Sequence, residues 1–153
     1  MLSRRDWLRT SIASAASALV ARPLLAEALT DAPTKITVYK SASCGCCKEW
    51  VKHLQANGFA VSAHDVDDLA SIKHTMGVPD KLASCHTGLV GRYVIEGHVP
   101  ADLIKTLLTT KPALLGLAVP GMPSSAPGMD GPKQPYDIIA FERNGSSRVY
   151  ARR

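Results

Sequence analysis

Three cysteines within four residues join a segment with the pattern of a β-strand to one with the pattern of an α-helix. Residues 35–40 alternate apolar and polar side chains, which is typical of a strand. Cys44, Cys46 and Cys47 follow, and residues 48–57 then carry their apolar side chains on one helical face. A chain of this kind enters its first helix through a turn that places the three thiols at the N-terminal end of that helix.

Strand and helix patterns alternate along the rest of the chain. They predict a strand over 59–66, a helix over 69–76, a hairpin of 87–90 with 93–95, a helix opening at Pro100, and a last hairpin of 136–141 with 148–150. The order of strand, helix, strand, helix, hairpin and helix is that of a thioredoxin-like α/β fold. We expect a mixed sheet with flanking helices and a cysteine-rich turn at the N-terminus of the first helix.

Residues 112–135 break this alternation. They contain six prolines and four glycines around Met122 and Met129, so we expect a long ordered loop without regular structure. The loop follows the last helix of the core, and we predict that it folds back toward the cysteine turn and limits the access of solvent and oxidants. Thioethers are ligands for Cu(I), and both methionines are candidate additional ligands. A flap that only packs over the site is the alternative.

The first 28 residues have the pattern of an export signal. Arg4 and Arg5 precede a weakly apolar stretch over 10–21, and Ala26-Glu27-Ala28 provides a cleavage pattern of small residues. This resembles a bacterial twin-arginine signal peptide, and an amphipathic helix with a chance arginine pair is the alternative. We therefore expect a mature single domain over 29–153 in the periplasm, where disulfides are permitted.

Charge and length limit the function classes further. The chain has 153 residues, which suits one domain, and a formal net charge of +5. Beyond residue 28, 14 basic residues stand against 11 acidic ones, without a basic stripe or interleaved aromatic residues. This distribution argues against a nucleic-acid partner. No apolar run is long enough to span a bilayer, so we expect no stable membrane anchor after cleavage.

The cysteine turn is suited to two chemistries. Cys44 and Cys47 form the C-x-x-C spacing of thiol–disulfide enzymes, and a helix N-terminus favours the thiolate form. A dithiol enzyme needs only two sulfurs, however, and Cys46 would offer it a competing disulfide. Three thiolates on one turn instead make a chelating site for a soft metal. Crowded thiolates fit Cu(I) best, with Zn and silver as alternatives.

A fourth cysteine is predicted to join the turn. Cys85 directly precedes the first strand of the 87–95 hairpin, a segment that lies against the cysteine turn in thioredoxin-like folds. The predicted metal site therefore consists of Cys44, Cys46, Cys47 and Cys85. His86 is a candidate ligand or proton acceptor, and His98 either caps the helix after Pro100 or supports the site. We expect His53, His64 and His74 to be surface residues.

Two other interpretations of the cysteines stay open. The four thiols can form two structural disulfides. Alternatively, Cys44 and Cys47 can act as the redox pair of a thiol–disulfide oxidoreductase or metal reductase. Whether the protein is an enzyme stays undecided at this point. A purely structural adaptor has little support, since such a domain does not need clustered thiols.

The chain from about residue 36 to its end resembles the domain of unknown function 411 family. The resemblance is carried by VYKSASCGCCKEWVKHL, DVDDL, SCHTGLVGRYVIEGHVP and GLAVPGMPSSAPGM. It implies a thioredoxin-like periplasmic protein that binds copper, as Cu(I) in a multinuclear copper–thiolate cluster held by the four cysteines. It also implies a contribution to copper resistance or copper redox handling, with copper ions and other periplasmic copper-handling proteins as partners.

Overall fold

A computed structural model describes residues 32–153. The predicted signal peptide over 1–28 lies outside the described residues. Within 32–153, none of the helices has the length and the apolar content that a membrane crossing requires.

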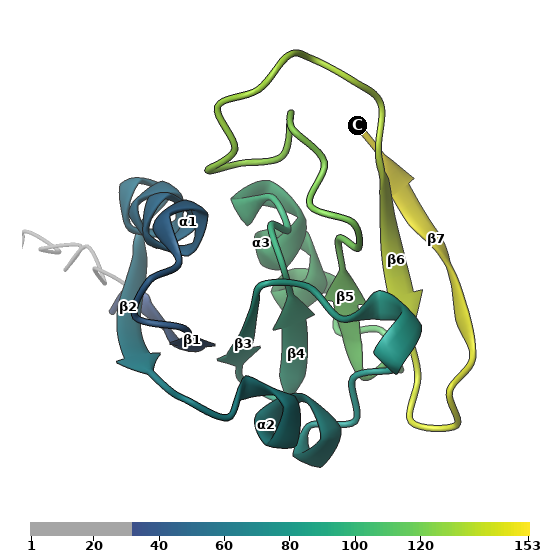
Figure 1. The fold of residues 1–153 in the computed structure, drawn as a ribbon. Helices are drawn as coiled ribbons and strands as arrows, with labels where there is room; N and C mark the ends of the chain where they lie inside the picture. The colour runs from purple at the N-terminus through teal and green to yellow at the C-terminus, as the bar shows by residue number, and fades with distance from the viewer. Residues whose placement is uncertain (1–31) are drawn as a thin grey trace, which may run out of the picture. The chain divides into compact units, whose positions relative to one another are not determined.

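A seven-stranded mixed sheet forms the centre of the fold (Figure 1). Its strands, in chain order, are β1 (Thr34–Lys40), β2 (Phe59–Asp65), β3 (His86–Val90), β4 (Tyr93–Glu96), β5 (Gly116–Ala118), β6 (Asp137–Phe141) and β7 (Ser147–Arg152). Across the sheet they run in the order β2-β1-β3-β4-β5-β6-β7. The pairs β1–β2 and β4–β5 are parallel, and all other neighbours are antiparallel.

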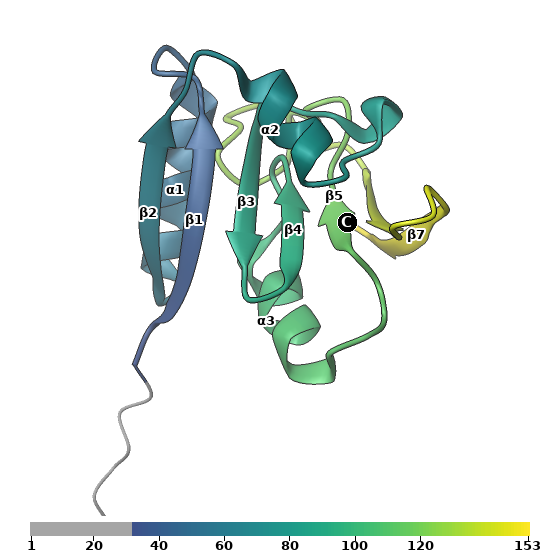
Figure 2. The same cartoon turned by 90° about the horizontal axis from the view of Figure 1, so that it is seen from below.

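Helices cover both faces of the sheet. They are α1 (Gly45–Ala56), α2 (Leu69–Thr75) and α3 (Ala101–Thr110), with a short 3-10 helix η1 (Asp80–Leu82) after α2. Figure 2 shows α1 and α2 on opposite sides of the strands. Trp50 and Leu54 of α1 and Ile104 of α3 belong to the larger core cluster, whereas Leu82 of η1 packs in a smaller cluster with Phe141 of β6. The predicted α/β class, with a mixed sheet, flanking helices and a cysteine turn at the first helix, is confirmed.

The first helix begins three residues earlier than its apolar pattern predicts. Cys44 is the N-cap, and its sulfur accepts a hydrogen bond from the backbone N–H of Cys47 at 3.3 Å. The cysteines therefore belong to the first turn of α1 and are not a loop before it. Gly58, with a φ of +86°, follows the helix in the left-handed conformation expected of a glycine at this place.

The segment 112–135 does contain regular structure, which corrects the expectation of a loop throughout. Residues Gly116–Ala118 form β5, which is fully buried and pairs with β4 and β6. A strand of three residues is too short to show an alternating pattern, so its apolar run cannot be distinguished from loop sequence. Gly116 is required there, because a Cβ atom would collide with the carbonyl group of Val94 and the ring of Phe141.

His53 joins α1 to α3. Its Nε2 accepts a hydrogen bond from the backbone N–H of Ala101 at 3.2 Å, at the start of α3. Contrary to the expectation of a surface residue, His53 is half-buried in this contact. Burial lowers the pKa of His53, and the nearby carboxylate of Asp102 opposes this shift. The neutral ring is therefore the form that accepts the bond.

We predict that His53→Ala lowers the melting temperature near neutral pH. Loss of one partly buried hydrogen bond costs about 1 kcal/mol, which corresponds to about 4 °C for a domain of this size. Because the folded-state pKa lies below the unfolded value of about 6.5, the unfolded chain binds more protons between the two values. The contribution is thus complete above pH ~6.5 and is lost as the pH falls through the folded-state pKa.

Calorimetry of both proteins from about pH 7.5 down to about pH 5 checks this linkage. The difference in melting temperature should shrink on acidification, while His74→Ala, an exposed residue of α2, should change little at any pH. An equal difference at all pH values would contradict the role of the neutral ring.

Candidate metal centre

The four cysteines of the chain converge on one place. The Sγ atoms of Cys44 and Cys46 are 3.6 Å apart, and those of Cys46 and Cys85 are 4.0 Å apart. All four sulfurs lie within 4.8 Å of one another. The pairing of β1 with β3 causes this convergence, because Lys40 lies opposite His86 and the chain segments beside them meet. The predicted approach of Cys85 to the cysteine turn is confirmed.

One disulfide joins two members of the cluster. Cys44 and Cys47 are bonded, and Cys46 and Cys85 are free thiols. The structure therefore contains one disulfide instead of the two that one interpretation allowed. The bonded pair is the C-x-x-C pair. Its reduced form can store two electrons as two thiols, next to the two free sulfurs.

Two buried histidines contact Cys85. The Nε2 atom of His98 lies 3.1 Å from the Cys85 sulfur, and the Nδ1 atom of His86 lies 3.3 Å from it. His98 Nδ1 donates a hydrogen bond to the carbonyl of Pro127 at 2.7 Å, because a carbonyl only accepts. In the neutral ring this leaves the lone pair of Nε2 directed at Cys85. His98 does not cap α3, whose N-cap is Pro100.

Burial sets the protonation states around Cys85. It raises the pKa of the Cys85 thiol to about 12, and the neighbouring Cys46 adds to the shift. Burial lowers the pKa of His98, and it lowers the pKa of His86 still further, with help from His98 and the ammonium of Lys73. At neutral pH the metal-free centre therefore carries a protonated Cys85 between two neutral imidazoles.

A buried carboxylate holds the Cys85 segment in place. Glu96 is fully buried in β4, and its carboxylate accepts hydrogen bonds from the backbone N–H of Ser84 at 2.6 Å and from the Thr87 hydroxyl at 2.7 Å. Lys73 of α2 completes the charge pair at 2.5 Å. Neither Glu96 nor Lys73 is among the site residues predicted from the sequence. The signal in the sequence is a carboxylate at the end of an apolar strand, which needs a partner when it is buried.

The segment after β5 folds back over the cysteine turn, as predicted. Figure 1 shows this light-green segment reaching toward α1. Gly128 packs so closely on α1 that a Cβ atom added to it would lie 2.6 Å from the backbone nitrogen of Trp50 and 3.1 Å from the backbone oxygen of Cys46. Met129 is partly buried against the core, whereas Met122 is exposed. Contact with the centre is therefore made by the backbone around Pro127 and Gly128, and a ligand role of the methionines stays a prediction.

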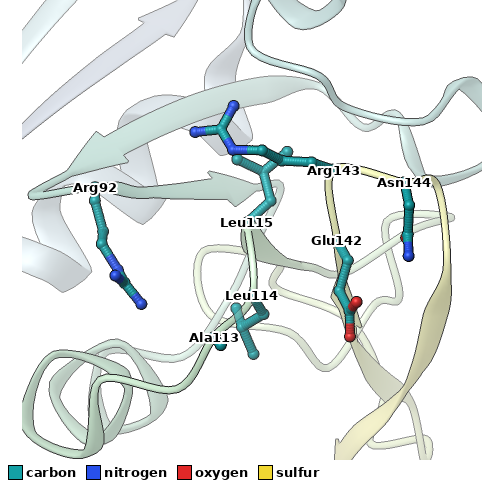
Figure 3. A pocket seen from close by; sticks show the side chains of 7 residues that line it. All are labelled: Arg92, Ala113, Leu114, Leu115, Glu142, Arg143 and Asn144. Carbon is teal, nitrogen blue, oxygen red and sulfur yellow. The ribbon is translucent and has the colours of Figure 1, made fainter.

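Other candidate features lie outside the centre. His64 on β2 is hydrogen-bonded to Ser62, and His74 is exposed on α2, so both are surface residues as expected. A cavity of about 410 Å³ lies beside the β3–β4 turn and the β6–β7 turn (Figure 3). Arg92, Leu114 and Glu142 are among its lining residues, and no cysteine or histidine lines it.

The donor atoms fit a soft metal. Thiolates separated by about 3.8 Å match the edges of a tetrahedral site with metal–sulfur bonds of about 2.3 Å, and the separations of 3.6 Å and 4.0 Å are close to this value. Reduction of the Cys44–Cys47 disulfide frees all four sulfurs for binding. Sulfur donors select Cu(I) and Zn(II) over hard cations.

Comparisons with known proteins agree with this chemistry. Residues 82–129 match the family model described as protein of unknown function, DUF411. Two solved structures, both titled copper resistance protein CopG (form 1 and form 2), share 43% identity with the chain at a TM-score of 0.75. Each match covers 79% of this chain and 98% of the CopG chain. Among curated proteins, none matches the chain.

We predict that Gly128→Ala exposes the cysteines. The new methyl group would collide with α1, and the φ of +84° is strained for alanine. A destabilisation of about 1–3 kcal/mol raises the open population by about fivefold to about 150-fold. The measurement is the rate at which iodoacetamide alkylates Cys46 and Cys85.

Gly121→Ala is the matched control, because Gly121 has a similar φ of +74° but nothing within 4 Å of a Cβ atom. Equal alkylation rates in the two variants would show that the close packing of Gly128 does not protect the thiols.

Proposed function

This chain belongs to the DUF411 family that includes the copper resistance protein CopG, and from this membership we propose that it binds Cu(I) through Cys44, Cys46, Cys47 and Cys85. The observation that carries the proposal is the convergence of four sulfurs within 4.8 Å. Cu(I) accepts low coordination numbers and bridging thiolates, so a crowded group of sulfurs suits one ion or a multinuclear copper–thiolate cluster. Met122 and Met129 are proposed additional ligands.

The surroundings of the sulfurs support retention of copper. Cys47 is fully buried, the other three cysteines are half-buried, and Gly128 packs against the backbone of Cys46. Copper binding displaces the thiol proton of Cys85, which the raised pKa otherwise retains. The imidazoles of His86 and His98 lie within hydrogen-bond distance of that sulfur, and because burial lowers the pKa of both, the displaced proton passes on to solvent.

The biological role that follows is copper resistance or copper redox handling in the periplasm. We propose that residues 1–28 act as a twin-arginine-type signal and that the mature domain exchanges copper with other periplasmic copper-handling proteins. The twin-arginine route carries folded proteins, so a filled site can be exported as such.

The disulfide favours a second candidate function. A thioredoxin-like thiol–disulfide oxidoreductase or metal reductase would use Cys44 and Cys47 as its redox pair. Oxidation of the two thiolates to the disulfide releases two electrons, which reduce two Cu(II) ions to Cu(I).

We predict that the reduced protein binds more than one Cu(I) per chain. Anaerobic titration against a chromogenic Cu(I) chelator measures the stoichiometry and the affinity. Cys46→Ser and Cys85→Ser should each weaken binding by about tenfold or more, since each removes a shared sulfur. Ser43→Ala, in the same turn, is the control without loss of sulfur. Unchanged affinity in both cysteine variants would contradict a shared site.

A second experiment separates binding from dithiol catalysis. We expect Cys46→Ser to retain the Cys44–Cys47 disulfide but to lose Cu(II) reduction with a thiol donor, because the copper ions lose their sulfur ligand. A dithiol oxidoreductase would tolerate Cys46→Ser and lose activity only in Cys44→Ser or Cys47→Ser. Insulin reduction in parallel reports the dithiol activity alone. Full Cu(II) turnover by Cys46→Ser would favour the dithiol enzyme.

A further inference from the structure

Cys85 belongs to two groups of potential metal ligands. One group consists of the four cysteine sulfurs. The other consists of Cys85, His86 and His98, whose ligand atoms also lie within 4.8 Å of one another. Both imidazoles are fully buried, and His86 Nε2 has no hydrogen-bond partner of acceptable geometry in the described part of the chain. Burial of a polar ring nitrogen without a hydrogen-bond partner costs free energy, so a buried imidazole of this kind points to a function that an aliphatic side chain cannot perform.

The distances from the Cys85 sulfur to its neighbours are compatible with the edges of a tetrahedral site. Metal–sulfur bonds of about 2.3 Å and metal–nitrogen bonds of about 2.0–2.1 Å place two sulfurs about 3.8 Å apart and a sulfur and a nitrogen about 3.6 Å apart. The Cys85 sulfur lies 4.0 Å from the Cys46 sulfur, 3.1 Å from His98 Nε2 and 3.3 Å from His86 Nδ1. All three separations are within about half an ångström of those edges.

The backbone carbonyl of Pro127, in the segment after β5, orients one of the imidazoles for metal binding. Metal-ligating histidines donate a hydrogen bond from their other ring nitrogen to a carbonyl or carboxylate, which fixes the tautomer. His98 makes this bond to Pro127 at 2.7 Å, and its free Nε2 faces Cys85. Pro127 thus gives His98 the outer partner that a metal ligand requires.

We propose that oxidation of Cys44 and Cys47 changes which metal the centre binds and does not empty it. In the disulfide form, Cys85, His86 and His98 make a site of one sulfur and two nitrogens for a divalent cation of borderline softness, such as Zn(II), and Cys46 is the nearest further thiol, 4.0 Å from the Cys85 sulfur. In the reduced form, the four sulfurs make the softer site for Cu(I). The inference rests on the proposed function for the reduced form only, and the two sites share Cys85.

The chemical reason is the loss of two thiolates. Disulfide sulfurs carry no negative charge and are poor ligands, so the oxidised turn retains only Cys46 as a thiolate donor. The imidazoles beside Cys85 bring the number of donors in this group to three, and Cys46 or a water molecule can take the fourth position of a tetrahedral site. Replacement of two thiolates by two imidazoles moves the preference away from Cu(I) and toward divalent ions.

The test uses the full chain and Co(II) as the metal probe. One equivalent of diamide, an azo oxidant, takes up two electrons and two protons as Cys44 and Cys47 form their disulfide, and a thiol assay should then count the two free thiols. Anaerobic titration of this form should show one Co(II) per chain, with thiolate-to-cobalt charge-transfer bands and the d–d bands of tetrahedral cobalt. Zn(II) should displace the Co(II).

Variants identify the ligands. His98→Ala and His86→Ala should each weaken Co(II) binding by about tenfold or more, while the surface variant His64→Ala should leave it unchanged. The double variant Cys44→Ser/Cys47→Ser should bind Co(II) with the same spectrum without oxidant, and it retains both histidines if a histidine variant fails to fold. Absence of Co(II) binding by both the oxidised protein and the double variant would overturn the inference, as would unchanged affinity in both histidine variants.

Parallel Cu(I) titration of the reduced protein separates this inference from the proposed function. Co(II) binding by the oxidised form without Cu(I) binding by the reduced form would refute the proposed function alone. The reverse pattern would refute the second site alone.

Discussion

The antiparallel pairing of β1 with β3 is the constraint on which the centre depends. Lys40 lies opposite His86, so the cysteine turn after β1 and Cys85 before β3 meet at the same end of the sheet. Side chains alternate between the faces of a sheet, and a register slip of one residue would exchange the faces of the β3 side chains. His86 would then leave the side of Trp50, whose ring centroid lies 4.3 Å away. The register of the sheet therefore also positions the cysteines and histidines of the candidate metal centre.

A buried charge pair secures this register from the opposite side of β3. The Glu96 carboxylate collects hydrogen bonds from Ser84 and Thr87, which flank Cys85 and His86, and its charge is balanced by Lys73. Removal of one partner of such a pair leaves an uncompensated buried charge, which is far more harmful than the absence of both. The charge pair holds the segment from Ser84 to Thr87 in place, because a carboxylate that accepts several hydrogen bonds fixes this segment in one conformation. The Gly97 N–H, which donates to the His86 carbonyl at 3.0 Å, reinforces the same loop.

The sequence predicted the parts of the site that local patterns report. The cysteine turn at a helix start and the return of Cys85 follow from the order of strands and helices, and both are found in the structure. The role of His98 is not readable from its neighbours, because its position before Pro100 suggests a helix cap. Its contacts with Cys85 and Pro127 arise only when segments distant in the sequence come together.

Two other features escaped prediction for different physical reasons. The strand β5 has three residues, too few for any periodicity to appear. Glu96 is an ionisable residue in an apolar strand, and a sequence does not show whether such a residue is buried with a partner or turned to solvent. In both cases tertiary contacts determine the structure, and local sequence preferences do not reveal those contacts.

The dispersion of the centre along the chain has a consequence for biogenesis. Its parts come from the start of α1, from Cys85, from His98 and from Gly128, so they assemble only after most of the domain has folded. Contacts between residues so far apart form late, because the chain entropy lost in closing long loops must be offset first. An unfolded chain in an oxidising compartment would expose four thiols that can pair in several wrong ways before the native contacts form. Under the export proposed for this chain, completion of folding beforehand in a reducing compartment would prevent this mispairing, because the native sulfur contacts would form before the chain enters an oxidising compartment.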